Sequence, residues 1–142
     1  MSSKIETIYD DSLTDFGGNY KPGDYNTPRG LINIRQCIQT SQNIPMVKIM
    51  AEMKPAKSIE YLEKMGITSL TEADDNISIS IGGFSQGISV LEMAAAYETI
   101  ANDGVYKTPI FFTKVVDREG KVILTAEQKE ERVFTEQNAY IV

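Results

Sequence analysis

A short polar triplet, Ser-Gln-Asn at residues 41–43, separates two runs of apolar residues that both have helical spacing. In the run before it, one helical face carries Leu31, Ile34, Cys37 and Ile38 at positions i, i+3, i+6 and i+7. Pro45 follows and suits the first turn of a second helix, because its missing N–H would have no partner there. The chain therefore needs a tight helix-to-helix junction, at which Ser41 and Asn43 either cap a helix or are displayed for chemistry.

Further local signals occur between residues 55 and 104. Pro55 is expected to begin a third helix, which has an apolar stripe and which Gly66 terminates. The alternating isoleucines of residues 77–81 predict a short strand. The sequence Ser-Val-Leu-Glu at 89–92 is a capping box and predicts the start of an alanine-rich helix. Residues 31–104 are thus expected to form a helical lobe.

The segments on either side of this lobe carry different signals. Residues 1–30 are rich in Gly, Asp, Asn and Pro, so we expect an extended, turn-rich segment. Residues 110–125 predict a β-hairpin that turns at Gly120. Residues 126–142 begin as a polar stretch and then start a further helical segment, with Thr135 as its cap. The predicted fold class is mainly α, a helical lobe with a small β-hairpin, in one partial domain over residues 1–142.

Composition excludes several classes of function. The chain of 142 residues has a net charge of −6, which argues against nucleic-acid binding, since that requires a basic face. It has no apolar run long enough to span a membrane and no signal-peptide core, so we expect a soluble piece. It has no histidine, which excludes histidine-based triads and the usual zinc sites. No metal and no cofactor is predicted, and the single cysteine, Cys37, is expected to be buried and inert.

Two motifs have plain structural explanations by local physics alone. The glycines at 82, 83 and 87 lack the spacing and the Lys-Ser/Thr pair of a phosphate-binding loop, so a tight connection is favoured. Ser and Asn at a helix junction are most often capping residues, and Asn43 is a plausible cap for the second helix. On these residues alone, capping and catalysis both remain open.

The surrounding sequence resembles one known family. "GLINIRQCIQTSQNIPMVKIM" is similar to the segment around the Ser-x-Asn motif in the transpeptidase domain of penicillin-binding proteins. The later stretch "ISISIGGFSQGISVLEMAAAYETIANDGVYKTPIFFTKVVDREGKVIL" resembles the segment after that motif in the bifunctional, high-molecular-mass class, and "YDDSLTDFGGNYKPGDYNTPRG" resembles the approach to the motif. The likeness covers roughly residues 8–142. It implies that the chain is part of the α/β penicillin-binding, serine-transpeptidase fold.

Two other motifs of that family do not occur in this chain. The acylated serine of the family lies in Ser-x-x-Lys, and a Lys-Thr/Ser-Gly triplet lines the facing strand. No serine here has Lys three residues later, and Lys107-Thr108 is followed by Pro109. From the order of the motifs, Ser-x-x-Lys is expected upstream of residue 1 and Lys-Thr-Gly downstream of Val142. The chain is therefore expected to be a central section that contains no nucleophile.

The resemblance implies a function for the parent protein. It would be a serine D,D-transpeptidase that cross-links peptidoglycan stem peptides through an acyl-enzyme and binds β-lactams. Ser41 maps to the proton-relaying serine and Asn43 to the substrate-binding asparagine, whereas Gln42 is expected to point elsewhere. The parent is expected to be membrane-anchored, with this domain on the outer face of the bacterial cytoplasmic membrane. The isolated chain is expected to be inactive, because it lacks the nucleophile.

Two other interpretations remain open at this point. The chain could come from a non-catalytic, penicillin-binding-like scaffold or protein-interaction module, in which case the parent also lacks the outer motifs. It could instead be an unrelated small helical domain with a stable fold of its own. The transpeptidase interpretation predicts the remainder of the transpeptidase domain as the partner, exposed apolar surface where that remainder packs, and self-association of the isolated chain.

Overall fold

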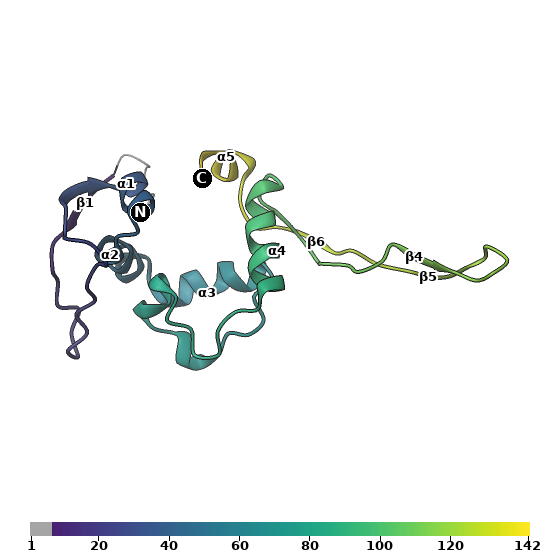
Figure 1. Ribbon diagram of the computed structural model, residues 1–142, viewed down its shortest axis with the longest axis horizontal. Helices are drawn as coiled ribbons and strands as arrows, with labels where there is room; N and C mark the ends of the chain where they lie inside the picture. Colours follow the sequence, from purple (N-terminus) through teal and green to yellow (C-terminus); the bar gives the residue numbers. More distant parts are fainter. Residues whose placement is uncertain (1–6) are drawn as a thin grey trace. The chain divides into compact units, whose positions relative to one another are not determined.

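The computed structural model describes residues 7–142 (Figure 1). The chain divides into two compact units. The first contains the described residues up to Ser58 together with Thr71–Ser85, and the second contains Ile59–Leu70 with Gln86–Val142. Helix α3 (Pro55–Lys64) contributes to both and begins at Pro55, as predicted. Each unit has buried apolar side chains of its own.

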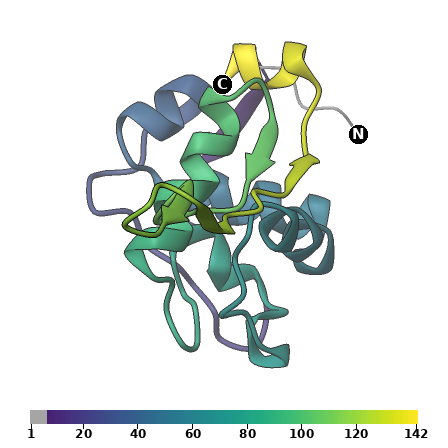
Figure 2. The ribbon, with the colours of Figure 1, turned by 90° about the vertical axis from the view of Figure 1, so that its right-hand side faces the viewer.

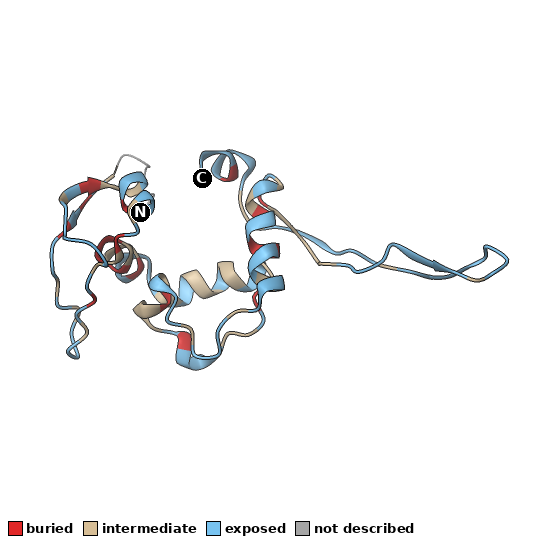
Figure 3. Cartoon of the chain, viewed as in Figure 1, coloured by how far each residue is buried: buried red, intermediate tan, exposed pale blue. Residues whose placement is uncertain are grey.

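A two-stranded sheet and two short helices form most of the first unit. Strand β1 (Ile8–Asp11) pairs antiparallel with β2 (Gly30–Asn33), so the turn-rich segment between them is a loop closed at its base. Helix α1 (Ile34–Gln39) follows β2 directly, and α2 (Asn43–Met53) follows after the polar triplet. The buried apolar side chains of these elements are Tyr9, Ile32, Cys37, Ile44, Val47 and Met50. Buried positions are coloured red on the ribbon in Figure 3.

The structure corrects the predicted start of the first helix. Residues 31–33 belong to β2, and Asn33 caps α1 through a capping box with Gln36. The exposed side chain of Leu31 therefore does not lie on a buried helical face. Helical spacing was misleading here because β1, about 20 residues earlier in the chain, supplies a strand partner to this segment.

A second correction concerns residues 77–81, where a strand was predicted. They form a 3-10 helix, η2 (Ile77–Ile81), which follows another 3-10 helix, η1 (Glu72–Asp74), and contacts α2. Polar side chains bind the local backbone: Asn76 accepts from the Ser78 N–H, and the Ser80 hydroxyl donates to the Ile77 carbonyl at 2.7 Å. Such local bonds offer the backbone an alternative to a sheet ladder, and no strand between residues 7 and 142 pairs with this segment.

The second unit is organised around α4 (Val90–Ala101). Strand β3 (Val105–Lys107) packs against α4 and pairs antiparallel with β6 (Glu130–Arg132), beside which it lies in Figure 2. Strands β4 (Lys114–Val116) and β5 (Val122–Thr125) form the predicted hairpin, and α5 (Glu136–Ile141) ends the chain with Thr135 as its cap. The strand β6 falls in the stretch that was expected to be only solvated and polar.

Small residues allow close packing in this unit. Ala95 and Ala96 of α4 are buried, as is Ala139 of α5, which contacts α4. Gly66 ends α3 with φ +83°, and a Cβ at this position would overlap the ring and hydroxyl of Tyr106. A side chain at Gly66 would therefore be excluded twice, by its backbone conformation and by the Tyr106 ring.

The hairpin leaves many apolar side chains in solvent. Val115, Val116, Val122, Ile123 and Leu124 are all between 41 and 66% exposed, and the ribbon is pale blue along β4 and β5 in Figure 3. Helices make up 39% and strands 15% of the described residues, with three antiparallel pairs among them instead of the single predicted hairpin. Within residues 7–142, no helix has the length and apolar character needed to cross a bilayer.

Candidate active site

Ser41 occupies the junction between α1 and α2 in an unusual backbone conformation. Its φ is +54°, in the left-handed region, and the residue is exposed. The backbone N–H donates to the Ile38 carbonyl at 3.2 Å, which closes the end of α1. Among residues 7–142, no hydrogen bond uses its hydroxyl. A left-handed serine costs about 1 kcal/mol and is often found where function requires a fixed geometry.

Gln42 points the opposite way, into the unit. It is 1% exposed, and its Nε2 donates to Oδ2 of Asp11 at 2.6 Å. Its backbone N–H donates to the Cys37 carbonyl at 3.0 Å. The middle residue of the triplet is thus an internal anchor, and its two neighbours are left closer to the surface, as expected from the sequence.

Asn43 is the first residue of α2 and does not cap it, so that part of the sequence interpretation was wrong. The N-cap is Gln42, which makes no side-chain capping bond. Asp24 caps the helix from the turn-rich segment: its Oδ1 accepts from the N–H of Asn43 at 2.5 Å and from that of Ile44 at 3.1 Å. The Asn43 amide donates to the Gly23 carbonyl at 2.8 Å. The residue that caps α2 therefore lies 19 positions before Asn43 in the sequence.

Two carboxyl groups lie under the triplet. Asp11 is fully buried, and its Oδ2 also accepts from the N–H of Arg29 at 2.8 Å. Burial raises the pKa of Asp24 above its ordinary value, and the neighbouring Asp11 raises it further, against the lowering effect of the two helix N–H donors. The sequence interpretation missed both residues, whose only signal was their place in the breaker-rich segment.

Cys37 and Lys48 do not provide a nucleophile or a base at the junction. Burial raises the pKa of the Cys37 thiol, and the carboxyl groups of Asp11 and Asp24 raise it further, which disfavours the reactive thiolate; the predicted burial of Cys37 is confirmed. The Lys48 ammonium donates to the backbone carbonyl of Asp10. Among the described residues, no set of three or more His, Cys, Asp or Glu could hold a metal ion.

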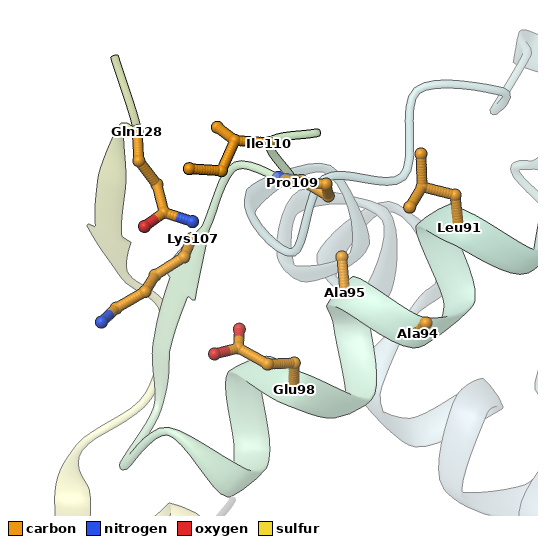
Figure 4. A pocket seen from close by; sticks show the side chains of 8 residues that line it. All are labelled: Leu91, Ala94, Ala95, Glu98, Lys107, Pro109, Ile110 and Gln128. Atoms are coloured by element: carbon orange, nitrogen blue, oxygen red, sulfur yellow. The ribbon is translucent and has the colours of Figure 1, made fainter. Parts of the chain in front are cut away.

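A hollow lies in the other unit, over α4 and β3 (Figure 4). It has a volume of about 360 Å³ and is lined by Leu91, Ala94, Ala95, Glu98, Lys107, Pro109, Ile110 and Gln128. These side chains include no hydroxyl and no thiol, and Lys107 is paired with Glu130 at 3.2 Å. The sequence interpretation did not identify this hollow, and it contains neither Ser41 nor Asn43.

Comparisons with known proteins agree on one family. The model of the penicillin binding protein transpeptidase domain matches residues 3–142. Penicillin-binding protein 1A of Clostridium botulinum is 36% identical over 129 residues, which cover 88% of this chain and 15% of that protein. Penicillin-binding protein 1F of Bacillus subtilis is 28% identical over 138 residues, covering 96% of this chain and 19% of the relative. The chain therefore spans less than a fifth of the length of these relatives.

A solved structure has the same backbone arrangement. The PonA1 protein of Mycobacterium tuberculosis in complex with penicillin V matches with a TM-score of 0.83 and 25% identity. The match covers 95% of this chain and 39% of that chain. The fold of residues 7–142 is thus part of the α/β fold of penicillin-binding transpeptidase domains.

Proposed function

Since the chain belongs to the transpeptidase-domain family of penicillin-binding proteins, we propose that it is the central section of a peptidoglycan D,D-transpeptidase of the bifunctional class. The main structural support for this proposal is the conformation of the junction at residues 41–43. There Ser41 is held in a left-handed conformation with its hydroxyl free of protein partners among residues 7–142. A helix cap would use that hydroxyl to bind a backbone N–H, and this serine does not.

Ser41 has the role of a proton relay in this proposal. A hydroxyl both donates and accepts, so it can pass a proton between a lysine amine and the leaving or incoming amine of the substrate. The Asn43 amide has the role of a substrate-binding group. One of its N–H bonds is directed to Gly23, which fixes the amide and leaves its oxygen and second N–H for a ligand.

The reaction needs groups from outside these 142 residues. A serine of a Ser-x-x-Lys motif attacks the D-Ala–D-Ala carbonyl, the terminal D-Ala leaves as a protonated amine, and an acyl-enzyme ester forms. The amine of a second stem peptide then displaces the serine, which regains its proton. β-Lactams would acylate the same serine. We place the parent in the membrane, with this domain on the outer face.

The test is fluorescent-penicillin labelling with intact-mass analysis of this chain and of its full-length parent. We expect the parent to be labelled and the chain to remain unlabelled, since the chain has no nucleophile. In the parent, Ser41→Ala or Asn43→Ala should lower the acylation rate about 10²-fold or more, as expected for the loss of a proton-transfer group. Ser12→Ala is the matched control, because this exposed hydroxyl only binds Asp10.

Each contrary result has a defined meaning. A parent that is not labelled would favour a non-catalytic, penicillin-binding-like scaffold. A hydrolysis-sensitive adduct on the isolated chain would show that a nucleophile had been overlooked. Wild-type acylation rates in both variants would show that Ser41 and Asn43 do not have these roles.

A further inference from the structure

Three buried oxygen atoms beneath the Ser-x-Asn junction have no hydrogen-bond partner among the described residues. They are Oδ1 of Asp11, Oδ2 of Asp24 and Oε1 of Gln42. All three are acceptors unless a carboxyl group carries a proton. A buried acceptor without a donor costs free energy. Three such acceptors around one turn therefore call for a hydrogen-bond donor among them.

The other oxygen of each carboxyl group accepts two hydrogen bonds. Oδ2 of Asp11 accepts from the Gln42 side chain and from the Arg29 backbone, at 2.6 and 2.8 Å. Oδ1 of Asp24 accepts from the first two N–H groups of α2. Each carboxyl group therefore holds one flank of the junction with one oxygen and leaves its other oxygen unpaired.

The two carboxyl groups interact with each other directly. The side chain of Asp11 lies close enough to that of Asp24 to raise the pKa of Asp24, after burial has raised it first. Two neighbouring ionised carboxylates have no donor to offer each other, and their like charges repel. One proton between the two unpaired oxygens satisfies both of them and removes one of the two charges.

We propose that Asp11 and Asp24 share one proton and act together as the positioning pair that holds Ser41 and Asn43 for acyl transfer. This inference rests on the proposed function of the Ser-x-Asn junction. Asp24 fixes the backbone of Asn43, and Asp11 fixes the side chain of Gln42. The two residues that follow the left-handed Ser41 are therefore both held by these carboxyl groups. The pair touches no substrate and acts through the backbone of the junction.

The surrounding groups do not neutralise a second charge. From α1, Cys37 presents a buried thiol, and from α2 the Lys48 ammonium is bound to Asp10. In the turn-rich segment, Arg29 meets Asp11 through its backbone N–H, and the buried Tyr20 hydroxyl has no hydrogen-bond partner among the described residues. No ion pair between described residues reaches Asp11 or Asp24. A shared proton is therefore the simplest way to hold both carboxyl groups in place.

The pair makes the junction sensitive to pH in one direction. Because the folded-state pKa of Asp24 is raised, its stabilising proton is fully present below the ordinary value of 3.8 and is lost as the pH rises through the raised pKa. Above that point two carboxylates face each other and the junction should loosen. The acylation rate should consequently fall as the pH rises through this range.

Asparagine substitutions in the full-length parent distinguish a shared proton from a bound cation and from a purely structural role. In Asp24→Asn, the amide oxygen can still accept from α2, and the amide N–H permanently donates to Asp11. We expect this variant to keep the wild-type acylation rate at low pH within about threefold and to lose the decline at higher pH. Asp11→Asn should behave in the same way. The double variant places two donors against each other and should lose about tenfold or more in rate. Asp75→Asn, at an exposed position, is the control.

Each contrary outcome overturns the proposal. An unchanged pH profile in Asp24→Asn would mean that the proton is not shared there. A changed melting temperature with unchanged acylation at every pH would mean a merely structural role. Loss of rate in both single variants, with activation of the wild type by added Na⁺ or Ca²⁺, would mean a bound cation. If penicillin labels none of the proteins, the proposed function fails. The pH dependence of unfolding in the same variants still tests the shared proton.

Discussion

Helices α2 and α4 begin in different ways. Helix α4 starts with a capping box, in which Ser89 and Glu92 satisfy each other's backbone N–H groups three residues apart. The N-cap of α2, Gln42, makes no side-chain capping bond, and the carboxylate of Asp24, 19 residues before Asn43, performs that role. The first start is encoded locally, whereas the second exists only when the turn-rich segment has folded against it.

The surroundings of the two capping carboxylates shift their pKa values in opposite directions. Glu92 accepts from the backbone and hydroxyl of Thr68 and from those of Ser89, and these donors lower its pKa to about 2, with the Thr68 N–H as the largest cause. Asp24 is desolvated next to Asp11, which raises its pKa. The N-terminus of a helix usually stabilises a carboxylate and lowers its pKa. The raised pKa of Asp24 therefore marks the junction as a candidate functional site, where burial next to a second carboxyl group outweighs that effect.

The largest effect is expected for Asp24→Ala. This change removes the cap of α2 and the partner of Asp11, and we expect the free energy of unfolding to fall by about 1–3 kcal/mol. Urea denaturation of the full-length parent would measure it. Asp15→Ala, which removes an exposed ion pair with Lys21, should cost less than about 1 kcal/mol. Equal losses in the two variants would show that the distant cap contributes nothing special.

A smaller effect is expected for Ser89→Ala. The loss of one local cap should cost about 1 kcal/mol, also measured by urea denaturation. Because Glu92 keeps its bonds to Thr68, the start of α4 should survive and the acylation rate should stay at the wild-type level. A fall in acylation comparable to that of Asp24→Ala would contradict the distinction between the two helix starts.

Ser41→Gly separates strain from chemistry. Glycine adopts positive φ freely, so we expect a stability change of less than about 1 kcal/mol, towards greater stability, together with a strong loss of acylation. Asp103→Gly is the matched control, because Asp103 also has a positive φ, of 53°, in the other unit. It should give a similar thermal shift and wild-type acylation. If both glycine variants keep full acylation, Ser41 is not a relay.

The smallest effect is expected for the pH dependence of stability that comes from Glu92 in the capping box of α4. The contribution of Glu92 is present above 4.5 and is lost as the pH falls from there towards about 2, the opposite direction to Asp24. Acid titration of unfolding should therefore be slightly less steep in Glu92→Gln than in the wild type. A steeper acid transition in Glu92→Gln would mean that the bonds to Thr68 and Ser89 do not stabilise the carboxylate.

Local signals in the sequence were sufficient for several elements. Pro55, Gly66, Gly120, the box at 89–92 and the cap at Thr135 all act within a few residues, and each was confirmed. Strand assignments failed where the partner was distant: residues 31–33 pair with β1, and Glu130–Arg132 pair with β3. Residues 77–81 failed because local serine and asparagine bonds override the alternating pattern.

In the candidate site, too, local sequence signals identified some residues, and residues that act through distant contacts were missed. Ser41 and Asn43 were identified because the motif around them resembles a known family, and their roles remain predictions. Asp11 and Asp24 could not be identified, because their importance comes from burial and from contacts to residues 19–31 positions away. Sequence patterns report which residues are displayed at a junction more readily than which residues hold it.

The distant cap on α2 has a consequence for the order of folding. Helix α4 can nucleate from its own residues, but the first turn of α2 is completed only when a loop of about 20 residues closes, at an entropic cost that grows with the logarithm of its length. Contacts of this sequence separation slow folding and form late. During synthesis, the turn-rich segment leaves the ribosome before α2 does. Its capping carboxylate is therefore already available when α2 emerges, and the first turn of the helix can be completed at once.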